Sequence, residues 1–149
     1  MKIDINGQNC DCKIDYYEND DFYKIEVLNE NKDVMGYATF KIKNSSFSKS
    51  IWLYKIETYN RYTHKGVGTA VNNILEYFAY KNKVLFIEGK FYPENKFAKP
   101  FYEKYGYKIE KDYYDTLVYK TLNYQWIEEE IAPKIKEYCE NTIIQDLEK

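Results

Sequence analysis

The sequence has a single histidine, few cysteines, little net charge and no long apolar run. Its 149 residues carry a formal charge of −2, so it lacks the general electrostatic attraction to DNA or RNA that a basic chain has. No apolar run is long enough to cross a bilayer, and the N-terminal stretch "MKIDINGQNCDCKID" is too polar for a signal peptide. We therefore expect a cytoplasmic protein with no nucleic-acid or membrane partner.

Cysteine and histidine are too sparse and too scattered for a metal site. Cys10, Cys12 and Cys139 are odd in number, which suits free thiols in a reducing compartment better than a disulfide framework. A metal site on Cys10-Asp11-Cys12 would need two further ligands, and His64 has no Cys or His near it in sequence. No metal is expected.

The rest of the composition, 44% apolar and 31% charged, describes one soluble globular domain. Short alternating runs predict strands over residues 2–6, 12–17, 22–28 and 34–43, and the last two form a hairpin around the polar turn 29–33. The stretch "IWLYKIET", residues 51–58, is apolar or aromatic on both faces. This pattern predicts a strand at the centre of the sheet, covered above and below.

The second half of the chain begins with a strong helical pattern. Apolar residues spaced by three and four predict a helix over residues 66–80, followed by a parallel strand over residues 84–87. A short helix over residues 97–105, with Pro100 in its first turn and Gly106 at its end, leads to an antiparallel pair over residues 107–110 and 115–121. Isoleucines beyond Leu122 predict two helical pieces divided at Pro133.

These elements define the expected fold class, which is α/β (α+β) with a mixed, mostly antiparallel sheet around a central parallel β-α-β unit. We expect one domain over residues 1–149, with a core at residues 1–121 and an additional helical segment at residues 122–149. The apolar stripe over residues 127–138 packs on this core or makes a homodimer.

Two glycines, Gly66 and Gly68, open the predicted long helix. The first amides of a helix have no intrahelical partner and lie at the positive end of its dipole, so bare amides over residues 65–69 predict a pyrophosphate site, with Lys65 and Thr69 as further donors. The sequence contains neither GxGxxG nor GxxxxGK[ST] here, which excludes the nucleotide-dehydrogenase and P-loop interpretations. A tight turn with close strand–helix packing is the alternative.

A second motif follows in "PENKFAKPFYEKYGYKI", where Asn95, Ala98 and Tyr102 are spaced by three and four and Gly106 comes next. Together with the turn "THKGVG", this segment resembles the GNAT superfamily of acetyl-CoA-dependent N-acetyltransferases. In that family a central strand enters a Q/R-x-x-G-x-G/A turn and helix, and an N-x-x-A-x-x-x-Y segment follows later. Thr63 replaces the usual Gln or Arg, and the family's N-terminal helix pair has no counterpart here.

The resemblance implies acetyl-CoA as cosubstrate and assigns residues to it. The pantetheine arm would pair with the central strand at Ile56 and Thr58, and Asn95 would bind pantetheine or phosphate groups, although it also suits a helix N-cap. Ala98 would leave room for the cosubstrate. The residues at the phosphates would be His64, Lys65, Gly66, Val67, Gly68 and Thr69.

The resemblance also implies catalytic roles. Tyr102 matches the tyrosine that protonates the departing sulfur and that also lines the cosubstrate site, and a backbone N–H near Ile56 or Glu57 would stabilise the oxyanion. No base is assigned by the resemblance: Glu57 on the central strand and Glu88 on the parallel strand are the candidates to deprotonate the amine, directly or through water, and a solvated strand carboxylate is the alternative for each. We expect an N-acetyltransferase that acetylates a primary amine of a small molecule or a protein by direct attack in a ternary complex.

A different class of function remains open. The chain would then be a catalytically silent module of the same fold that senses CoA or associates with proteins, as a monomer or homodimer. Three features favour this alternative: Thr63 in place of Gln or Arg, the absence of an assigned base, and the additional amphipathic segment at the C-terminus.

Overall fold

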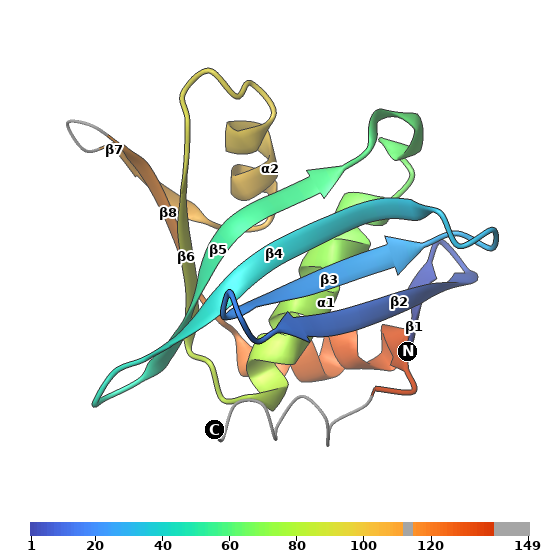
Figure 1. The fold of residues 1–149 in the computed structure, drawn as a ribbon, viewed down its shortest axis with the longest axis horizontal. Coiled ribbons are helices and arrows are strands. Elements are labelled where there is room, and N and C mark those ends of the chain that lie inside the picture. Colours follow the sequence, from blue (N-terminus) through green and yellow to red (C-terminus); the bar gives the residue numbers. More distant parts are fainter. Residues whose placement is uncertain (112–114, 139–149) are drawn as a thin grey trace.

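The described residues, 1–111 and 115–138, form one nine-stranded sheet with a helical layer on it, seen in a computed structural model (Figure 1). The strand order is β7-β8-β6-β5-β4-β3-β2-β1-β9. All neighbouring strands are antiparallel except β5 and β6. The strands are β1 Lys2–Ile5, β2 Gln8–Tyr17, β3 Phe22–Leu28, β4 Val34–Asn44, β5 Lys49–Thr58, β6 Phe86–Phe91, β7 Lys108–Lys111, β8 Thr116–Thr121 and β9 Ile135–Lys136.

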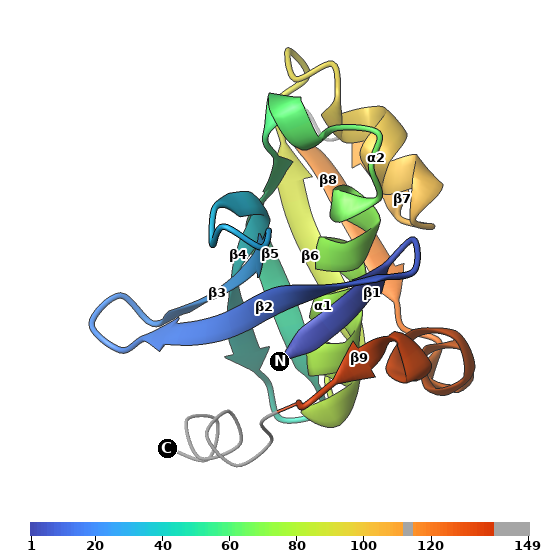
Figure 2. The same cartoon turned by 90° about the vertical axis from the view of Figure 1, so that its right-hand side faces the viewer.

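The described helices lie on one face of this sheet (Figure 2). They are α1 Val67–Lys81, α2 Ala98–Lys104 and α3 Tyr124–Trp126, and α3 continues as a π-helical turn Ile127–Ile131 and a 3₁₀ turn Ala132–Lys134. We call the other face of strands β2–β6 the open face, because no described helix covers it. Within the described residues, no helix is long and apolar enough to span a bilayer.

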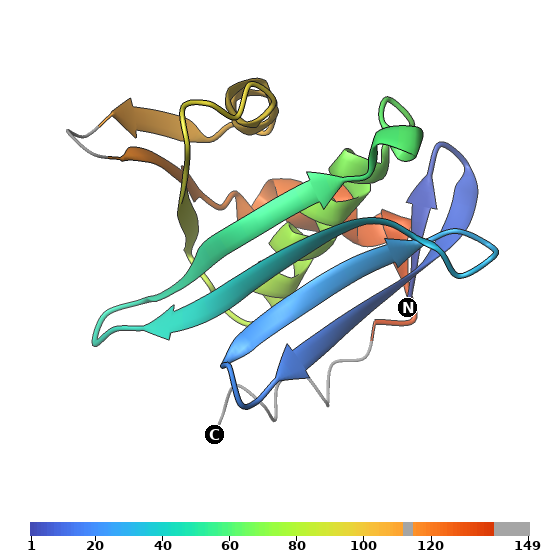
Figure 3. The ribbon, with the colours of Figure 1, turned by 45° about the horizontal axis from the view of Figure 1, so that its top comes forward.

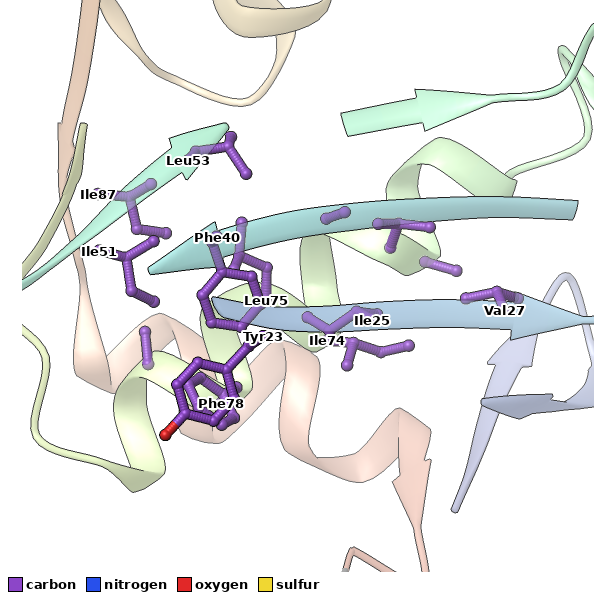
Figure 4. Close-up of a cluster of buried hydrophobic side chains, with 14 of the residues drawn as sticks. Tyr23, Ile25, Val27, Phe40, Ile51, Leu53, Ile74, Leu75, Phe78 and Ile87 are labelled. Carbon is purple, nitrogen blue, oxygen red and sulfur yellow. The ribbon is translucent and has the colours of Figure 1, made fainter. Parts of the chain in front are cut away.

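The main core lies between α1 and strands β3, β4 and β5 (Figure 4). The Phe40 ring lies 5.4 Å from that of Tyr23 and 5.1 Å from that of Phe78, so the two strands and the helix meet at three aromatic rings. Phe40 and Phe78 are fully buried, and each such side chain contributes about 1.5–3 kcal/mol to stability. The core thus fixes α1 across the centre of the sheet.

Most elements confirm the fold class expected from the sequence, and the parallel pair is joined through α1 as predicted. The strand after α1 is displaced: it was predicted at residues 84–87 and spans Phe86–Phe91. Val84 instead belongs to the turn that caps the end of α1, because its amide donates to the Ala79 carbonyl at 2.8 Å. Its carbonyl accepts a hydrogen bond from the Tyr124 hydroxyl.

The C-terminal segment differs from the prediction of two helical pieces divided at Pro133. One helical run ends in the 3₁₀ turn that contains Pro133, and Ile135–Lys136 then pairs with β1 as strand β9. Proline lacks the amide that would continue the helix, so the chain is free to extend there. Ile127 and Ile131 are fully buried in the main core. Cys139 and the rest of the predicted second piece lie outside the described residues.

Candidate active site

Strands β5 and β6 diverge halfway along β5 (Figure 3). Their parallel pairing runs from Ser50↔Phe86 to Leu53↔Gly89, whereas β5 stays paired with β4 as far as Gly36↔Thr58. At the point of divergence β5 has a bulge, since Leu53 and Lys55 face consecutive residues of β4 and Tyr54 is extra. Bulges bend and twist a strand. From Tyr54 to Thr58 the edge of β5 is therefore unpaired within the described structure and available to an extended ligand.

The chain leaves β5 and enters α1 through the glycine turn. Gly66 has φ +86°, a left-handed conformation that favours glycine, and is the N-cap of α1. The first backbone hydrogen bond of the helix joins the Ala70 amide to the Gly66 carbonyl at 3.0 Å. Among the described residues, the amides of Val67, Gly68 and Thr69 have no acceptor. This is the bare helix start that the sequence predicted.

Close packing brings this helix start against the unpaired part of β5. A Cβ on Gly36 of β4 would lie 2.8 Å from Cγ1 of Val67, so only glycine lets α1 begin directly over β4. A Cβ on Gly68 would lie 3.2 Å from Oγ1 of Thr58. The two interpretations of the glycines are therefore compatible, since the turn is closely packed and its amides are also bare.

Helix α2 lies beside the start of α1. The hydroxyls of Thr69 and Tyr105 form a hydrogen bond, and the Phe101 ring lies 3.5 Å from where a Cβ of Gly68 would be. Gly106, at φ +83°, ends α2, and the Tyr107 amide closes the motif by donating to the Tyr102 carbonyl at 2.9 Å. The hydroxyl of Thr69 is thus already engaged, whereas its amide is not.

Tyr102, a residue of α2, is buried in an aromatic cluster with Phe91 and Tyr107. Its ring stacks on that of Phe91, with 5.7 Å between the ring centroids, and packs edge-on against that of Tyr107, with 5.1 Å between the centroids. Burial raises the pKa of Tyr102 to about 12. The phenol therefore holds its proton throughout the neutral range, as a proton donor must.

Asn95 lies just before α2 and forms no hydrogen bond with the glycine turn among the described residues. Its Oδ1 accepts a hydrogen bond from the Phe97 amide at 3.1 Å, so its side-chain oxygen caps the turn that leads into α2. It also lines a cavity of about 780 Å³ between α2 and strands β6, β7 and β8, to which no residue of the turn contributes. Ala98 is buried at the start of α2. Of the predicted site residues, Thr58 therefore packs against the glycine turn, whereas Asn95 bonds within its own turn.

The turn before Gly66 is exposed and locally bonded. His64 and Lys65 are both exposed, and Asn6 of the β1–β2 turn donates to the Lys65 carbonyl at 3.2 Å. Thr63, which departs from the family pattern, uses its hydroxyl to bond the Asn60 carbonyl at 2.9 Å. Within the described chain, the side chains of His64 and Lys65 form no hydrogen bond. Both are therefore available to an anion at the helix start.

Glu57 and Glu88 both lie on the open face but are far apart along it. Glu88 of β6 lies opposite Trp52 of β5. Trp52 precedes Glu57 by five residues, which corresponds to about 16 Å along the strand. The Glu88 carboxylate lies 4.0 Å from Nζ of Lys43. The two carboxylates therefore do not act as a pair.

Glu57 belongs to a cluster that sequence reasoning missed. The Tyr37 hydroxyl donates to Oε2 of Glu57 at 2.8 Å, and Nζ of Lys55 lies 3.2 Å from the same oxygen. The hydrogen bond from Tyr37, aided by Lys55, lowers the pKa of the Glu57 carboxyl. Only strand alternation marks Tyr37 in the sequence, because its contact with Glu57 depends on the pairing of β4 with β5.

Comparison with known proteins agrees with this geometry. The sequence profile of the acetyltransferase (GNAT) family matches residues 6–107, and no curated protein sequence matches significantly. PaiA N-acetyltransferase from Thermoplasma acidophilum, solved with coenzyme A, is similar at TM-score 0.60 and 23% identity over 70% of this chain and 64% of that chain. A GNAT acetyltransferase from Staphylococcus aureus (TM-score 0.62, 14% identity, 72% of each chain) and Tetrahymena GCN5 (0.59, 14%, 70% of each) share the fold.

At these identities the solved structures establish the fold alone, and the family assignment comes from the profile match over most of the chain. That match confirms the resemblance noted in the sequence, and acetyl-CoA as the expected cosubstrate agrees with it. The chain belongs to the GNAT acetyltransferase family.

Proposed function

We propose that this protein transfers the acetyl group of acetyl-CoA to a primary amine in a ternary complex. One observation carries the proposal: the bare amides of Val67, Gly68 and Thr69 lie directly beside the unpaired edge of β5. A pyrophosphate suits the first site, because a helix start offers free N–H groups and a positive dipole end. An extended amide-bearing arm suits the second.

The residues of this chain would hold the cosubstrate as follows. The amides of residues 66–69 bind the pyrophosphate, and the exposed Lys65 and His64 add donors at its rim. The backbone of Ile56 and Thr58 pairs with the pantetheine arm, because β6 no longer occupies that edge. Asn95 and Ala98, at the start of α2, would line the pantetheine arm.

Acetyl-CoA supplies an activated thioester: the amine nitrogen bonds to the carbonyl carbon, the carbon–sulfur bond breaks, and the ammonium proton leaves to a base. A backbone N–H near Ile56 or Glu57 donates to the carbonyl oxygen as negative charge develops, which is worth roughly 3 kcal/mol in comparable sites. Tyr102 gives its hydroxyl proton to the departing sulfur, and the proton held by the base returns to the Tyr102 phenolate through solvent once the products have left.

The raised pKa of Tyr102 does not disqualify it as the donor. Burial also raises thiol pKa values, and within this chain it raises that of Cys12 to about 12. A thiolate leaving beside Tyr102 would experience similar desolvation, so donor and acceptor remain matched. The same burial keeps solvent protons away from the sulfur, which makes a positioned phenol useful.

Glu57 is ionised at neutral pH and therefore in the correct state to accept a proton, but the lowered pKa makes it a weak base. Glu88 lies where β5 and β6 are still paired, at the closed end of the diverging strands. We assign the role of proton acceptor to Glu57, because it lies on the unpaired segment of β5 and Glu88 does not.

The test compares wild type with Tyr102→Phe. Isothermal titration should show saturable acetyl-CoA binding by both proteins, whereas turnover with a panel of primary amines should fall about a hundredfold in the variant. Urea unfolding of both proteins controls for damage to the fold. If acetyl-CoA binds neither protein at millimolar concentration, the proposal is wrong.

A catalytically silent CoA-binding module is the second candidate. It is favoured by Thr63, whose hydroxyl is used within its own turn, and by Thr69, whose hydroxyl bonds Tyr105. Both remove side-chain donors that an acetyltransferase would direct at the phosphates. Saturable acetyl-CoA binding without turnover of any amine would select this candidate.

We also propose that residues 1–149 act as one domain, with the segment from residue 122 built into it. Ile127 and Ile131 are fully buried and join the same core as α1. The Tyr80 hydroxyl of α1 donates to Glu128 of the segment. These contacts favour packing within the chain over a homodimer as the role of the apolar stripe.

A further inference from the structure

We propose that Glu57, Tyr37 and Tyr59 form a subsite for an alkylammonium group of the acceptor, and that Lys55 occupies this subsite until the acceptor displaces it. This inference rests on the proposed function and deepens it, because it assigns a substrate class to the site. The expected ligand is a linear primary amine, either a diamine or a lysine side chain.

The subsite combines a carboxylate with aromatic rings. The Tyr37 hydroxyl fixes one oxygen of Glu57 at 2.8 Å. The Tyr37 and Tyr59 rings lie 5.9 Å apart and tilted by 40°, and Tyr59 is partly exposed. The carboxylate of Glu57 attracts an ammonium group through its charge, and a tyrosine ring face attracts one through the ring quadrupole.

The subsite already holds cations that belong to the chain. Nζ of Lys55 lies 3.2 Å from Glu57 and 5.9 Å from the centre of the Tyr37 ring, and Nζ of Lys24 lies 5.1 Å from that ring. Two ammonium groups thus lie near the Tyr37 ring, and that of Lys55 also contacts Glu57. Lys24 is also 3.9 Å from Glu26, whereas Lys55 pairs with Glu57.

The position of the subsite suits an acceptor. Glu57 and Lys55 belong to the segment of β5 that no longer pairs with β6. Their side chains are on the open face, because Glu57 faces Tyr37, whereas Thr58 next to it faces Gly68 of α1. The phosphate site lies on the helical face and the ammonium subsite on the other, so donor and acceptor approach the same stretch of β5 from opposite sides.

Displacement of Lys55 is energetically feasible. The Lys55 and Glu57 side chains are 60% and 40% exposed, and ion pairs of that exposure are weak. Removal of this internal competitor should tighten alkylammonium binding by about two- to fivefold. Loss of the Glu57 charge should weaken it by about tenfold or more.

The test titrates 1,5-diaminopentane into the full-length protein by calorimetry, with and without saturating CoA. The variants are Lys55→Met, Glu57→Gln and Tyr37→Phe. The matched control is Lys41→Met, since Lys41 is a lysine of the same open face that pairs with Asp21 at 3.5 Å, away from the subsite. Lys55→Met should bind more tightly than wild type, Glu57→Gln and Tyr37→Phe more weakly, and Lys41→Met equally.

Aniline, an amine that is largely uncharged at pH 7, provides the second readout. Its KM in the acetylation assay should not distinguish Lys55→Met from wild type, whereas that of the diamine should fall. Equal diamine affinity in Lys55→Met and Lys41→Met, or unchanged affinity in Glu57→Gln, would overturn the subsite, as would no saturable diamine binding in the millimolar range. If CoA fails to bind while the diamine pattern holds, the proposed function is wrong and the subsite stands.

Discussion

Gly68→Ala should weaken CoA binding while leaving the stability of the fold nearly unchanged. The glycine lies in the first turn of α1, and the new methyl would lie 3.2 Å from Oγ1 of Thr58 and 3.5 Å from the Phe101 ring. Alanine gains about 0.5–1 kcal/mol over glycine in a helix, and the tight contact with Thr58 offsets part of this gain. The free energy of unfolding should therefore stay within about 1 kcal/mol of wild type.

The same methyl would fill the space between the bare amides and β5. Displacement of the pyrophosphate from one charge-assisted hydrogen bond costs about 1.5–3 kcal/mol, so CoA affinity should fall about ten- to a hundredfold. Urea unfolding and calorimetric titration with CoA measure the two quantities. Unchanged CoA affinity in Gly68→Ala would refute the reasoning.

Gly7→Ala is the matched control for this experiment. Gly7 has φ +88° in the β1–β2 turn, and a Cβ there would have no neighbour within 4 Å. Alanine in that conformation costs about 1–2 kcal/mol of stability through backbone strain. The control should therefore lose stability and keep CoA affinity, the reverse of the pattern expected for Gly68→Ala.

Three further predictions concern stability. Glu76→Gln should cost about 3 kcal/mol in urea unfolding, because Glu76 is 1% exposed and lies 2.8 Å from Nζ of Lys120; a loss below about 1 kcal/mol would contradict the buried ion pair. Ile131→Ala should cost about 3 kcal/mol, since Ile131 is fully buried, and unchanged stability would place the C-terminal segment outside the core. Burial raises the pKa of Cys12 from 9.0 to about 12, so the unfolded chain loses this proton first and stability falls as the pH rises from 9 toward 12. Above pH 9 the free energy of unfolding of Cys12→Ala should fall less steeply with pH than that of wild type, by up to about 1.4 kcal/mol per pH unit. Identical slopes for the two proteins would contradict this account.

The parts of the fold that the sequence predicted well are those set by local physics. β3 spans Phe22–Leu28 as expected from its composition and the polar turn after it. The start of α1 followed from two glycines and an apolar period of three and four, both properties of adjacent residues. Pro100 and Gly106 marked the two ends of α2 for the same reason, since each restricts or frees its own backbone.

The parts that the sequence did not predict depend on partners far along the chain. β6 continues through Gly89 and Lys90, which carry no apolar signal, because β8 pairs with it as far as Phe91↔Thr116. Ile135 extends as a strand because β1 offers it an edge at Ile3. The ammonium subsite arises in the same way, since the pairing of β4 with β5 across a bulge brings Tyr37 to Glu57.

The central claim is that the bare amides at the start of α1 bind the pyrophosphate of CoA, and amide NMR tests it most directly. CoA titrated into ¹⁵N-labelled protein should shift the amide resonances of Val67, Gly68 and Thr69 saturably, with one common dissociation constant. Saturable CoA binding that leaves these three resonances in place would contradict the claim.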